Sequence, residues 1–161
     1  ISLMLIATKS SKFDISAESF AASIAKKLAT FLKNSDVVFL YGEIGVGKTT
    51  FVRHLINNIQ IKNNVKLSEV TSPTFNIVNQ YEVKNLLIQH YDLFRLKNSN
   101  ESKNIGLFED SANVITLIEW PEKIEKKPLN TIDLIFEYDQ DIKKRFLTIK
   151  GLSKEKLNEI R

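Results

Sequence analysis

The most constraining feature of this chain is a buried-strand pattern followed at once by a glycine-rich loop and a helix pattern. Residues 37–41 are Val-Val-Phe-Leu-Tyr, a continuous apolar run typical of a strand buried on both faces. Residues 42–49, Gly-Glu-Ile-Gly-Val-Gly-Lys-Thr, fit the pattern G-x-x-x-x-G-K-[ST] at every specified position. Apolar residues then recur at helical spacing as far as Ile59. A strand, a glycine loop and a helix in this order predict a phosphate-binding loop.

The residue types in this loop suit phosphate binding. Three of the five glycines lie between residues 42 and 47, and glycine lets the backbone bring its N–H groups close to phosphate oxygens. The helix that follows adds the positive end of its dipole. Lys48 would place its charge on the β- and γ-phosphates, and Thr49 would ligate Mg²⁺. The residues expected to contact nucleotide are Gly42, Glu43, Ile44, Gly45, Val46, Gly47, Lys48, Thr49 and Thr50.

Two acidic residues that end apolar runs are candidates for the rest of the site. Asp92 follows residues 86–91, and Glu119 follows residues 114–118. Ligands of open α/β sheets bind at the carboxyl ends of parallel strands. Glu119 fits this geometry if its strand is parallel to the strand before the glycine loop, and Asp92 needs only its strand to end nearby. The alternative for each is a capping or surface carboxylate. His90 is expected in the core or behind a ligand, rather than in direct catalysis.

Two further features have open interpretations. Trp120, the only tryptophan, could pack in the core, stack on a base or anchor a partner. Ser72 and Thr74 flank Pro73, which removes a backbone donor and favours extended geometry in the residue before it. The two hydroxyls are interpreted either as part of a switch-like loop that senses the γ-phosphate or as caps of a proline turn.

The length of 161 residues predicts one domain covering residues 1–161. Beside the two elements around the glycine loop, a helix is expected over residues 16–33, with Ser16 as its N-cap. Residues 152–161 are expected to form a short helix or a frayed end, and residues 96–104 a polar loop. Further strands are expected over residues 3–8, 76–83, 86–93, 113–119, 131–138 and 145–150.

Composition argues against several classes of protein. No segment approaches 18 consecutive apolar residues, so no membrane-spanning helix is expected. The absence of cysteine excludes disulfides and thiol chemistry and fits a cytoplasmic location. The net charge of +4 comes from scattered basic residues rather than one block, which favours a solvated surface over attraction to nucleic acid.

Four motifs, in this order and at these spacings, resemble one family. They are the loop and helix start at residues 42–53, Ser-Pro-Thr-Phe at 72–75, His-Tyr-Asp-Leu-Phe-Arg at 90–95 and Ile-Glu-Trp-Pro-Glu at 118–122. Over residues 16–150 the chain resembles the TsaE family (also called YjeE), the bacterial ATPases of tRNA threonylcarbamoyladenosine synthesis. The glycine loop alone is shared by very many proteins, whereas the combination of motifs is specific.

The resemblance implies a fold and an activity. The expected fold is the α/β P-loop NTPase fold, with a central parallel sheet extended by antiparallel strands and helices on both faces. The expected activity is weak hydrolysis of ATP with Mg²⁺. The expected partners are TsaB and TsaD, of which TsaD transfers the threonylcarbamoyl group to an adenosine beside the anticodon. ATP turnover would reset that complex between rounds, so the chain would act on tRNA only indirectly. The isolated chain is expected to be a monomer.

The family's residue roles can be carried to the matching positions of this sequence. Lys48 would hold phosphates and support catalysis, Thr49 and Asp92 would bind Mg²⁺, and Glu119 would contact the ion and orient or activate water.

Three further assignments concern the edges of the site. Thr74 would lie in the switch-like loop, and Trp120 near the nucleotide or a partner surface. Residues 16–19 would correspond to the start of the family's first helix, near the adenine.

Two other functions stay open at this point. A small-molecule kinase would need an acceptor pocket and usually an arginine-bearing lid, and only Arg53 and Arg95 precede Arg145. A nucleotide-dependent interaction module would need binding but not hydrolysis. A GTPase is disfavoured, because no N-K-x-D base-reading sequence is present.

Overall fold

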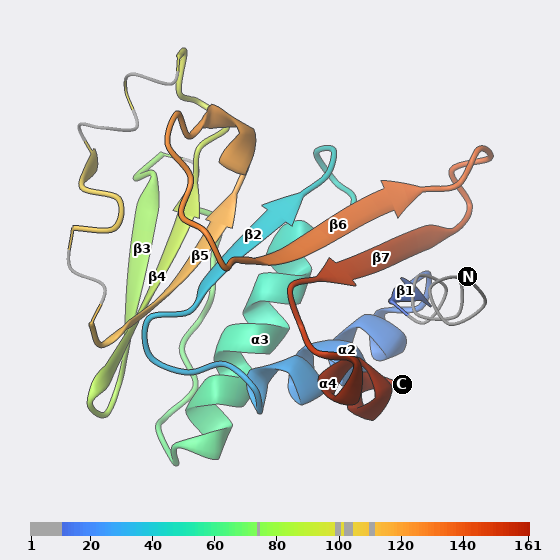
Figure 1. Ribbon diagram of the computed structural model, residues 1–161, viewed down its shortest axis with the longest axis horizontal. Coiled ribbons are helices and arrows are strands. Elements are labelled where there is room, and N and C mark those ends of the chain that lie inside the picture. Colours follow the sequence, from blue (N-terminus) through green and yellow to red (C-terminus); the bar gives the residue numbers. More distant parts are fainter. Residues whose placement is uncertain (1–10, 74, 99–100, 102–104, 110–111) are drawn as a thin grey trace.

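Seven strands and three α-helices make up the regular structure of the described residues (Figure 1). The computed structural model describes residues 11–73, 75–98, 101, 105–109 and 112–161. The expected strand over residues 3–8 therefore lies outside the described residues, as does part of the expected loop over residues 96–104. The elements in order are β1 (Lys12–Asp14), α2 (Glu18–Ala29), β2 (Val37–Tyr41), α3 (Lys48–Lys62), β3 (Val78–Val83), β4 (Leu86–Asp92), β5 (Val114–Glu119), the 3-10 helix η2 (Pro121–Lys123), β6 (Ile132–Tyr138), β7 (Arg145–Lys150) and α4 (Lys154–Ile160).

The strands form one mixed sheet in the order β1-β7-β6-β2-β5-β4-β3. The four central strands, β6, β2, β5 and β4, run parallel to one another. Antiparallel strands extend both sides of this centre, with β3 paired to β4 on one side and β7 then β1 beyond β6 on the other. The predicted architecture, a parallel centre with antiparallel additions, is confirmed. Strand β5 is buried along its whole length, as a central parallel strand between two covered faces must be.

The side chains of β2, β4 and β5 alternate between two apolar cores. On one face, Val38 and Leu40 of β2 belong to the larger core, which includes buried residues of α2, α3 and α4. On the other face, Phe39 joins a smaller core with Tyr91 and Ile118. Helical cover is therefore unequal: α-helices lie on one face (Figure 1), while the 3-10 helix η2 and neighbouring loops cover the other.

The start of α2 differs from the prediction. Ser16 is not the N-cap, because the helix begins at Glu18 after Ala17, which makes no side-chain cap bond. The Ser16 hydroxyl instead donates to Asp14 Oδ1 at 2.6 Å and accepts from the backbone N–H of Arg145 at 3.0 Å. The prediction failed because Ser16 has a partner on β7, a strand that sequence spacing does not bring to this point. The bond joins the turn after β1 to the first residue of β7.

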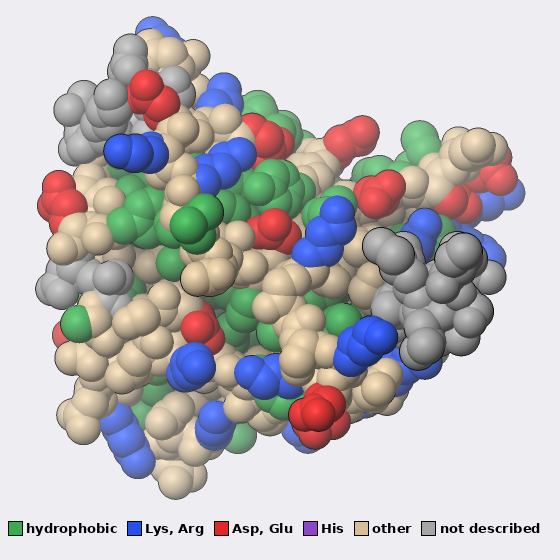
Figure 2. Space-filling model, in the orientation of Figure 1, with side chains coloured by type: hydrophobic (Ala, Val, Ile, Leu, Met, Phe, Trp, Pro, Cys, Tyr) green, Lys and Arg blue, Asp and Glu red, His purple; other side chains and the backbone are tan. Residues whose placement is uncertain are grey.

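Two surface properties bear on location and partners. No helix in the part of the chain that the structure describes has the length and apolar character needed to cross a membrane. On the face visible in Figure 2, lysine and arginine side chains are spread among acidic ones rather than gathered into one block.

Gly151 closes the turn after β7 under tight steric conditions. Its φ is +93°, and a Cβ at this position would lie 2.3 Å from the carbonyl oxygen of Thr131, a backbone atom with no freedom to move aside. We expect Gly151→Ala to lower the free energy of unfolding by roughly 3 kcal/mol, from left-handed strain plus overpacking. Urea unfolding followed by circular dichroism measures the change.

Gly106 offers a matched control for this substitution. Its φ is +74°, but an added Cβ would meet only the flexible Glu109 side chain, at 3.1 Å. We expect Gly106→Ala to cost about 1 kcal/mol, the backbone strain alone. Equal losses in the two variants would contradict the steric argument at Gly151.

Candidate nucleotide-binding site

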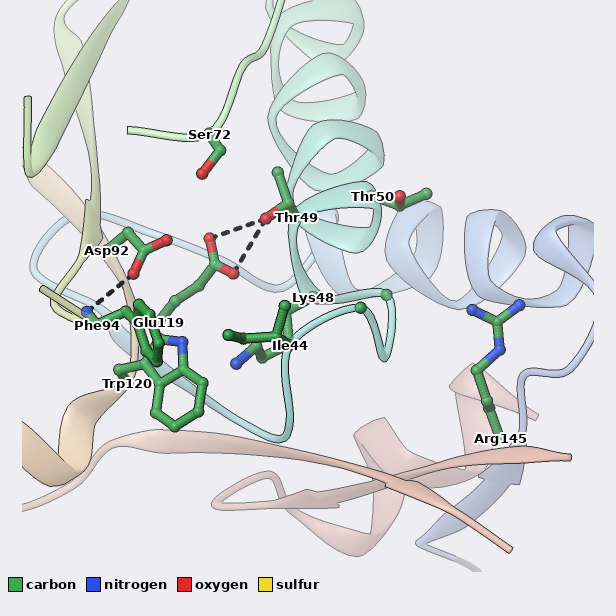
Figure 3. A pocket seen from close by; sticks show the side chains of 12 residues that line it. Ile44, Lys48, Thr49, Thr50, Ser72, Asp92, Phe94, Glu119, Trp120 and Arg145 are labelled. Carbon is green, nitrogen blue, oxygen red and sulfur yellow. Dashed lines mark hydrogen bonds between the residues drawn. The ribbon is translucent and has the colours of Figure 1, made fainter. Parts of the chain in front are cut away.

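A cavity of about 380 Å³ lies at the carboxyl ends of the parallel strands (Figure 3). Its lining combines the glycine loop, the start of α3 and the ends of β4 and β5. The lining residues are Ile44, Gly45, Gly47, Lys48, Thr49, Thr50, Ser72, Asp92, Phe94, Glu119, Trp120 and Arg145.

The glycine loop has a backbone that other residues adopt only with strain. Gly42 has a φ of +146°, and a Cβ there would lie 2.9 Å from the carbonyl oxygen of Phe136. Gly47 is left-handed, with a φ of +111°, and directly precedes α3. No side chain caps this helix start, and the first turn contains no acidic residue. The N-terminal backbone N–H groups and the positive dipole end of α3 therefore favour an anion at this edge of the cavity.

Lys48 is the cationic group inside this part of the cavity. Its side chain is 4% exposed, and its ammonium donates a hydrogen bond to the carbonyl oxygen of Gly42. The same Nζ lies 4.0 Å from the ring centroid of Trp120, a cation–π contact. Burial lowers the pKa of Lys48, while the nearby carboxylates of Glu119 and Asp92 oppose that shift. An anionic ligand in the cavity would therefore favour the charged form of Lys48.

Asp92 and Glu119 lie opposite each other at the ends of β4 and β5. Glu119 is 2% exposed and accepts from the Thr49 hydroxyl, with Oγ1 3.1 Å from Oε1 and 3.3 Å from Oε2. Asp92 is 8% exposed, and its Oδ1 accepts from the backbone N–H of Phe94 at 3.0 Å. Burial raises the pKa of the Asp92 carboxyl, and the hydrogen bond from the backbone N–H of Phe94 lowers it. The neighbouring carboxylate of Glu119 raises the pKa of Asp92 further. Two carboxylates thus face one partly desolvated space.

The donor set suits a hard cation. Thr49, Asp92 and Glu119 offer only hydroxyl and carboxylate oxygens, the ligands that Mg²⁺ prefers. Within the described ranges, no cluster of three or more His, Cys, Asp or Glu side chains could hold a metal ion. Mg²⁺ sites in phosphate-transfer proteins rarely need such a cluster, since one or two carboxylates combine with water and substrate phosphates.

His90 stands behind the carboxylates. It is fully buried, and its Nε2 lies 2.6 Å from Oε2 of Glu119. It therefore contacts a cavity residue without lining the cavity itself.

The structure does not bring every residue expected at the nucleotide to this cavity. Gly42, Glu43 and Val46 line a separate hollow of about 350 Å³ against the β6–β7 hairpin, and the Val46 side chain is buried in the core. Thr74 lies outside the described residues, whereas Ser72 lines the cavity. The other predicted residues are all among its lining, namely Ile44, Gly45, Gly47, Lys48, Thr49, Thr50, Asp92, Glu119 and Trp120.

Arg145 is a cavity residue that sequence reasoning missed. It opens β7 and lies across the glycine loop from Asp92 and Glu119 (Figure 3). It also lines a smaller hollow of about 110 Å³ that includes Glu18, within the region expected near adenine. A basic residue at the start of a late strand has the pattern of a solvated surface residue. The one feature of the sequence that points to Arg145 is the scarcity of other arginines, because only Arg53 and Arg95 precede it.

Comparison with known proteins supports a family assignment. The family profile described as "Threonylcarbamoyl adenosine biosynthesis protein TsaE" matches residues 15–146. A Rickettsia felis protein named "tRNA threonylcarbamoyladenosine biosynthesis protein TsaE" is 41% identical over 102 residues, covering 63% of this chain and 57% of that protein. The protein of the same name from Aquifex aeolicus is 37% identical over 121 residues, covering 75% of this chain and 83% of that protein.

A solved structure matches the fold. The crystal structure of YdiB from Bacillus subtilis superposes with a TM-score of 0.68 at 25% identity, covering 92% of this chain and 90% of that one. Two of the matches span less than two thirds of the relative's own length. The match covers 57% of the R. felis protein and 61% of the protein of the same name from Rickettsia conorii.

The buried carboxylate of Asp92 is expected to favour ligand binding at the expense of the stability of the folded state. Because burial raises its folded pKa above 3.8, ionised Asp92 destabilises the folded state, a cost that grows as pH rises through the folded pKa. We expect Asp92→Asn, which keeps an acceptor for Phe94, to raise the melting temperature at pH 7. The gain should shrink as pH falls through the raised pKa of Asp92, because the wild-type carboxyl then becomes neutral too. Scanning calorimetry without nucleotide measures it, and a lower melting temperature at pH 7 would contradict the desolvation argument.

Proposed function

Because the chain belongs to the TsaE family, we propose that it is a Mg²⁺-dependent ATPase that supports threonylcarbamoyladenosine modification of tRNA. One observation carries the proposal: Lys48 and Thr49 of the glycine loop share a single cavity with Asp92 and Glu119 of adjacent strand ends. Phosphoryl transfer requires groups of these kinds: a loop and a lysine that bind phosphates, a hydroxyl and a carboxylate that bind Mg²⁺, and a carboxylate near the attacking water.

The proposed division of labour follows from the positions of these side chains. Lys48 and the N–H groups at the start of α3 would bind the β- and γ-phosphates. Thr49, Asp92 and Glu119 would hold Mg²⁺, which when bound would neutralise charge on the phosphate oxygens. Glu119 would orient a water molecule and accept its proton as the water oxygen attacks the γ-phosphorus. The bond from that phosphorus to the β–γ bridging oxygen would break, leaving ADP and phosphate.

Two residues would complete nucleotide recognition. The guanidinium of Arg145, on the far side of the glycine loop, supplies planar donors suited to phosphate oxygens. The Trp120 ring already contacts the Lys48 ammonium and lies 5.0 Å, centroid to centroid, from Phe94. A phosphate that draws Lys48 toward itself would change the surroundings of this indole.

The proposed partners are TsaB and TsaD, with tRNA reached through their complex. The chain would bind that complex as a cytoplasmic monomer and reset it through ATP hydrolysis. Two exposed aromatic side chains support a partner surface: Phe94, which lines the cavity, is 43% exposed, and Phe75 is 85% exposed. The ring centroid of Phe75 lies 5.0 Å from Cζ of Arg95, the residue after Phe94.

Substitutions in the cavity test the ATPase assignment. We expect Lys48→Ala to reduce phosphate release from Mg-ATP by on the order of 100-fold or more, because a charge-stabilising donor is lost. Glu119→Gln should abolish turnover while ATP binding persists, since the amide is a poor proton acceptor. A phosphate-release assay and equilibrium binding of ATP provide the two measurements.

A matched control comes from the same helix. Lys62 ends α3 and its Nζ bonds the carbonyl oxygen of Thr30, far from the cavity lining, so Lys62→Ala should leave turnover unchanged. Near-normal turnover in Lys48→Ala would refute the phosphate site. Survival of tRNA modification in cells that carry only Glu119→Gln would favour the interaction module, in which hydrolysis is dispensable.

Addition of the partners tests the second half of the proposal. We expect phosphate release by the chain alone to be slow and to rise severalfold when purified TsaB–TsaD is added, because the complex would be the client that turnover serves. The comparison uses one enzyme concentration with and without the partners, and Lys48→Ala with partners as the blank. Turnover indifferent to TsaB–TsaD would contradict the reset role and lead to a screen of small acceptors for kinase activity.

A further inference from the structure

His90 is the one histidine of this chain that is enclosed by the fold. It lies on β4, two residues before Asp92, and its side chain is fully buried. Its Nε2 lies 2.6 Å from Oε2 of Glu119, which makes this the shortest contact that the structure gives to that carboxylate. The other histidine, His54, contacts the exposed Glu18 at 3.2 Å on the surface of α3.

Hydrogen-bond accounting assigns the proton on His90. An ionised carboxylate only accepts, so Nε2 must carry the hydrogen in its bond with Glu119. Nδ1 is buried and has no hydrogen-bond partner among the residues that the structure describes. A proton on Nδ1 would be a buried donor without an acceptor, and orphaned buried N–H groups are rarer in proteins than under-satisfied acceptors. The neutral tautomer with its proton on Nε2 pairs that donor with Glu119 and leaves only an acceptor nitrogen, Nδ1, unpaired among the described residues.

The two groups that hold Glu119 come from different parts of the fold. Thr49 belongs to the start of α3, directly after the loop that must accommodate the phosphates. His90 belongs to β4, which is hydrogen-bonded to the strand of Glu119 from Leu87 through Asp92. The His90 bond therefore ties the carboxylate to the rigid sheet, whereas the Thr49 bond ties it to the ligand-binding loop.

We propose that His90 is a positioning residue that orients the Glu119 carboxylate by donating from Nε2 to Oε2. Oε1, which bonds only Thr49 among the described side chains, is then the oxygen that meets water in the cavity. The catalytic meaning of this orientation rests on the proposed function, but the hydrogen bond and its tautomer do not. Loss of a group that hydrogen-bonds a ligating carboxylate from outside the site typically lowers activity or metal affinity by about 10–100-fold.

Nitrogen-15 NMR of the chain without nucleotide tests the hydrogen bond directly. With two histidines only, His90→Gln assigns the spectrum. We expect His90 to show one tautomer, with its proton on Nε2 and slow exchange with water, while His54 shows averaged nitrogens. Glu119→Gln should move the Nε2 shift of His90 and leave His54 unchanged. A proton on Nδ1, or no response to Glu119→Gln, would overturn the proposal.

Steady-state hydrolysis of Mg-ATP tests the consequence. His90→Leu removes the donor at similar volume, and we expect kcat to fall about 10–100-fold with little change in KM. His90→Gln restores an N–H donor and should recover much of the loss, while His54→Gln should behave as wild type. Equal losses of kcat in the Leu and Gln variants would overturn a role through Glu119.

These outcomes separate two kinds of failure. A wild-type protein without ATP turnover would refute the proposed function, while the NMR response of His90 to Glu119→Gln would still decide whether His90 holds this carboxylate. Should His90→Leu not fold, the tautomer of His90 in the wild-type chain and its response to Glu119→Gln, both measured by NMR, still decide whether His90 holds this carboxylate.

Discussion

The parallel alignment of β2, β5 and β4 is the constraint on which the candidate site depends. Glu119 lies opposite Leu40, two residues before Gly42, and Asp92 lies opposite Glu119. All three strands therefore end at one edge of the sheet, where β4 and β5 place Asp92 and Glu119 in the cavity and β2 leads into the glycine loop that carries Lys48. A slip of one residue in the register of β5 would turn the Glu119 side chain to the other face and leave Asp92 as the remaining carboxylate of the cavity.

This arrangement buries charge, and burial has an energetic consequence. Lys48, Asp92 and Glu119 are all less than a tenth exposed. Charged groups so enclosed are costly unless they are paired and hydrogen-bonded. Part of the cost is offset internally, through the bonds of Glu119 to Thr49 and His90. The raised pKa of Asp92 and the lowered pKa of Lys48 mark what is not offset. A polyphosphate with its cation would complete that pairing, so the site trades stability for binding.

The two faces of the sheet contribute differently to the site. The α-helical face supplies the start of α3 and rests on the larger core. The opposite face is covered by η2 and loops, and there Trp120 turns the chain with a left-handed φ of 61° directly after Glu119. That turn brings the indole over the Lys48 ammonium. The cavity thus lies where a rigid helical layer meets a thinner layer made of turns.

Much of the fold and of the candidate site follows from the sequence, because both depend on local patterns. The apolar runs that end in Asp92 and Glu119, and the glycine spacing before Lys48, predict the strands and their polar ends, whereas the parallel centre of the sheet was implied only by the resemblance to the TsaE family. Tertiary structure alone decided which distant groups meet there. Arg145 reaches the cavity because β7 pairs beyond β6, and the partner of His90 is set by the pairing of β4 with β5. The spacing of apolar residues along the sequence indicates which face of a helix or strand is buried. The pairing of strands that are distant in the sequence determines what each buried side chain contacts.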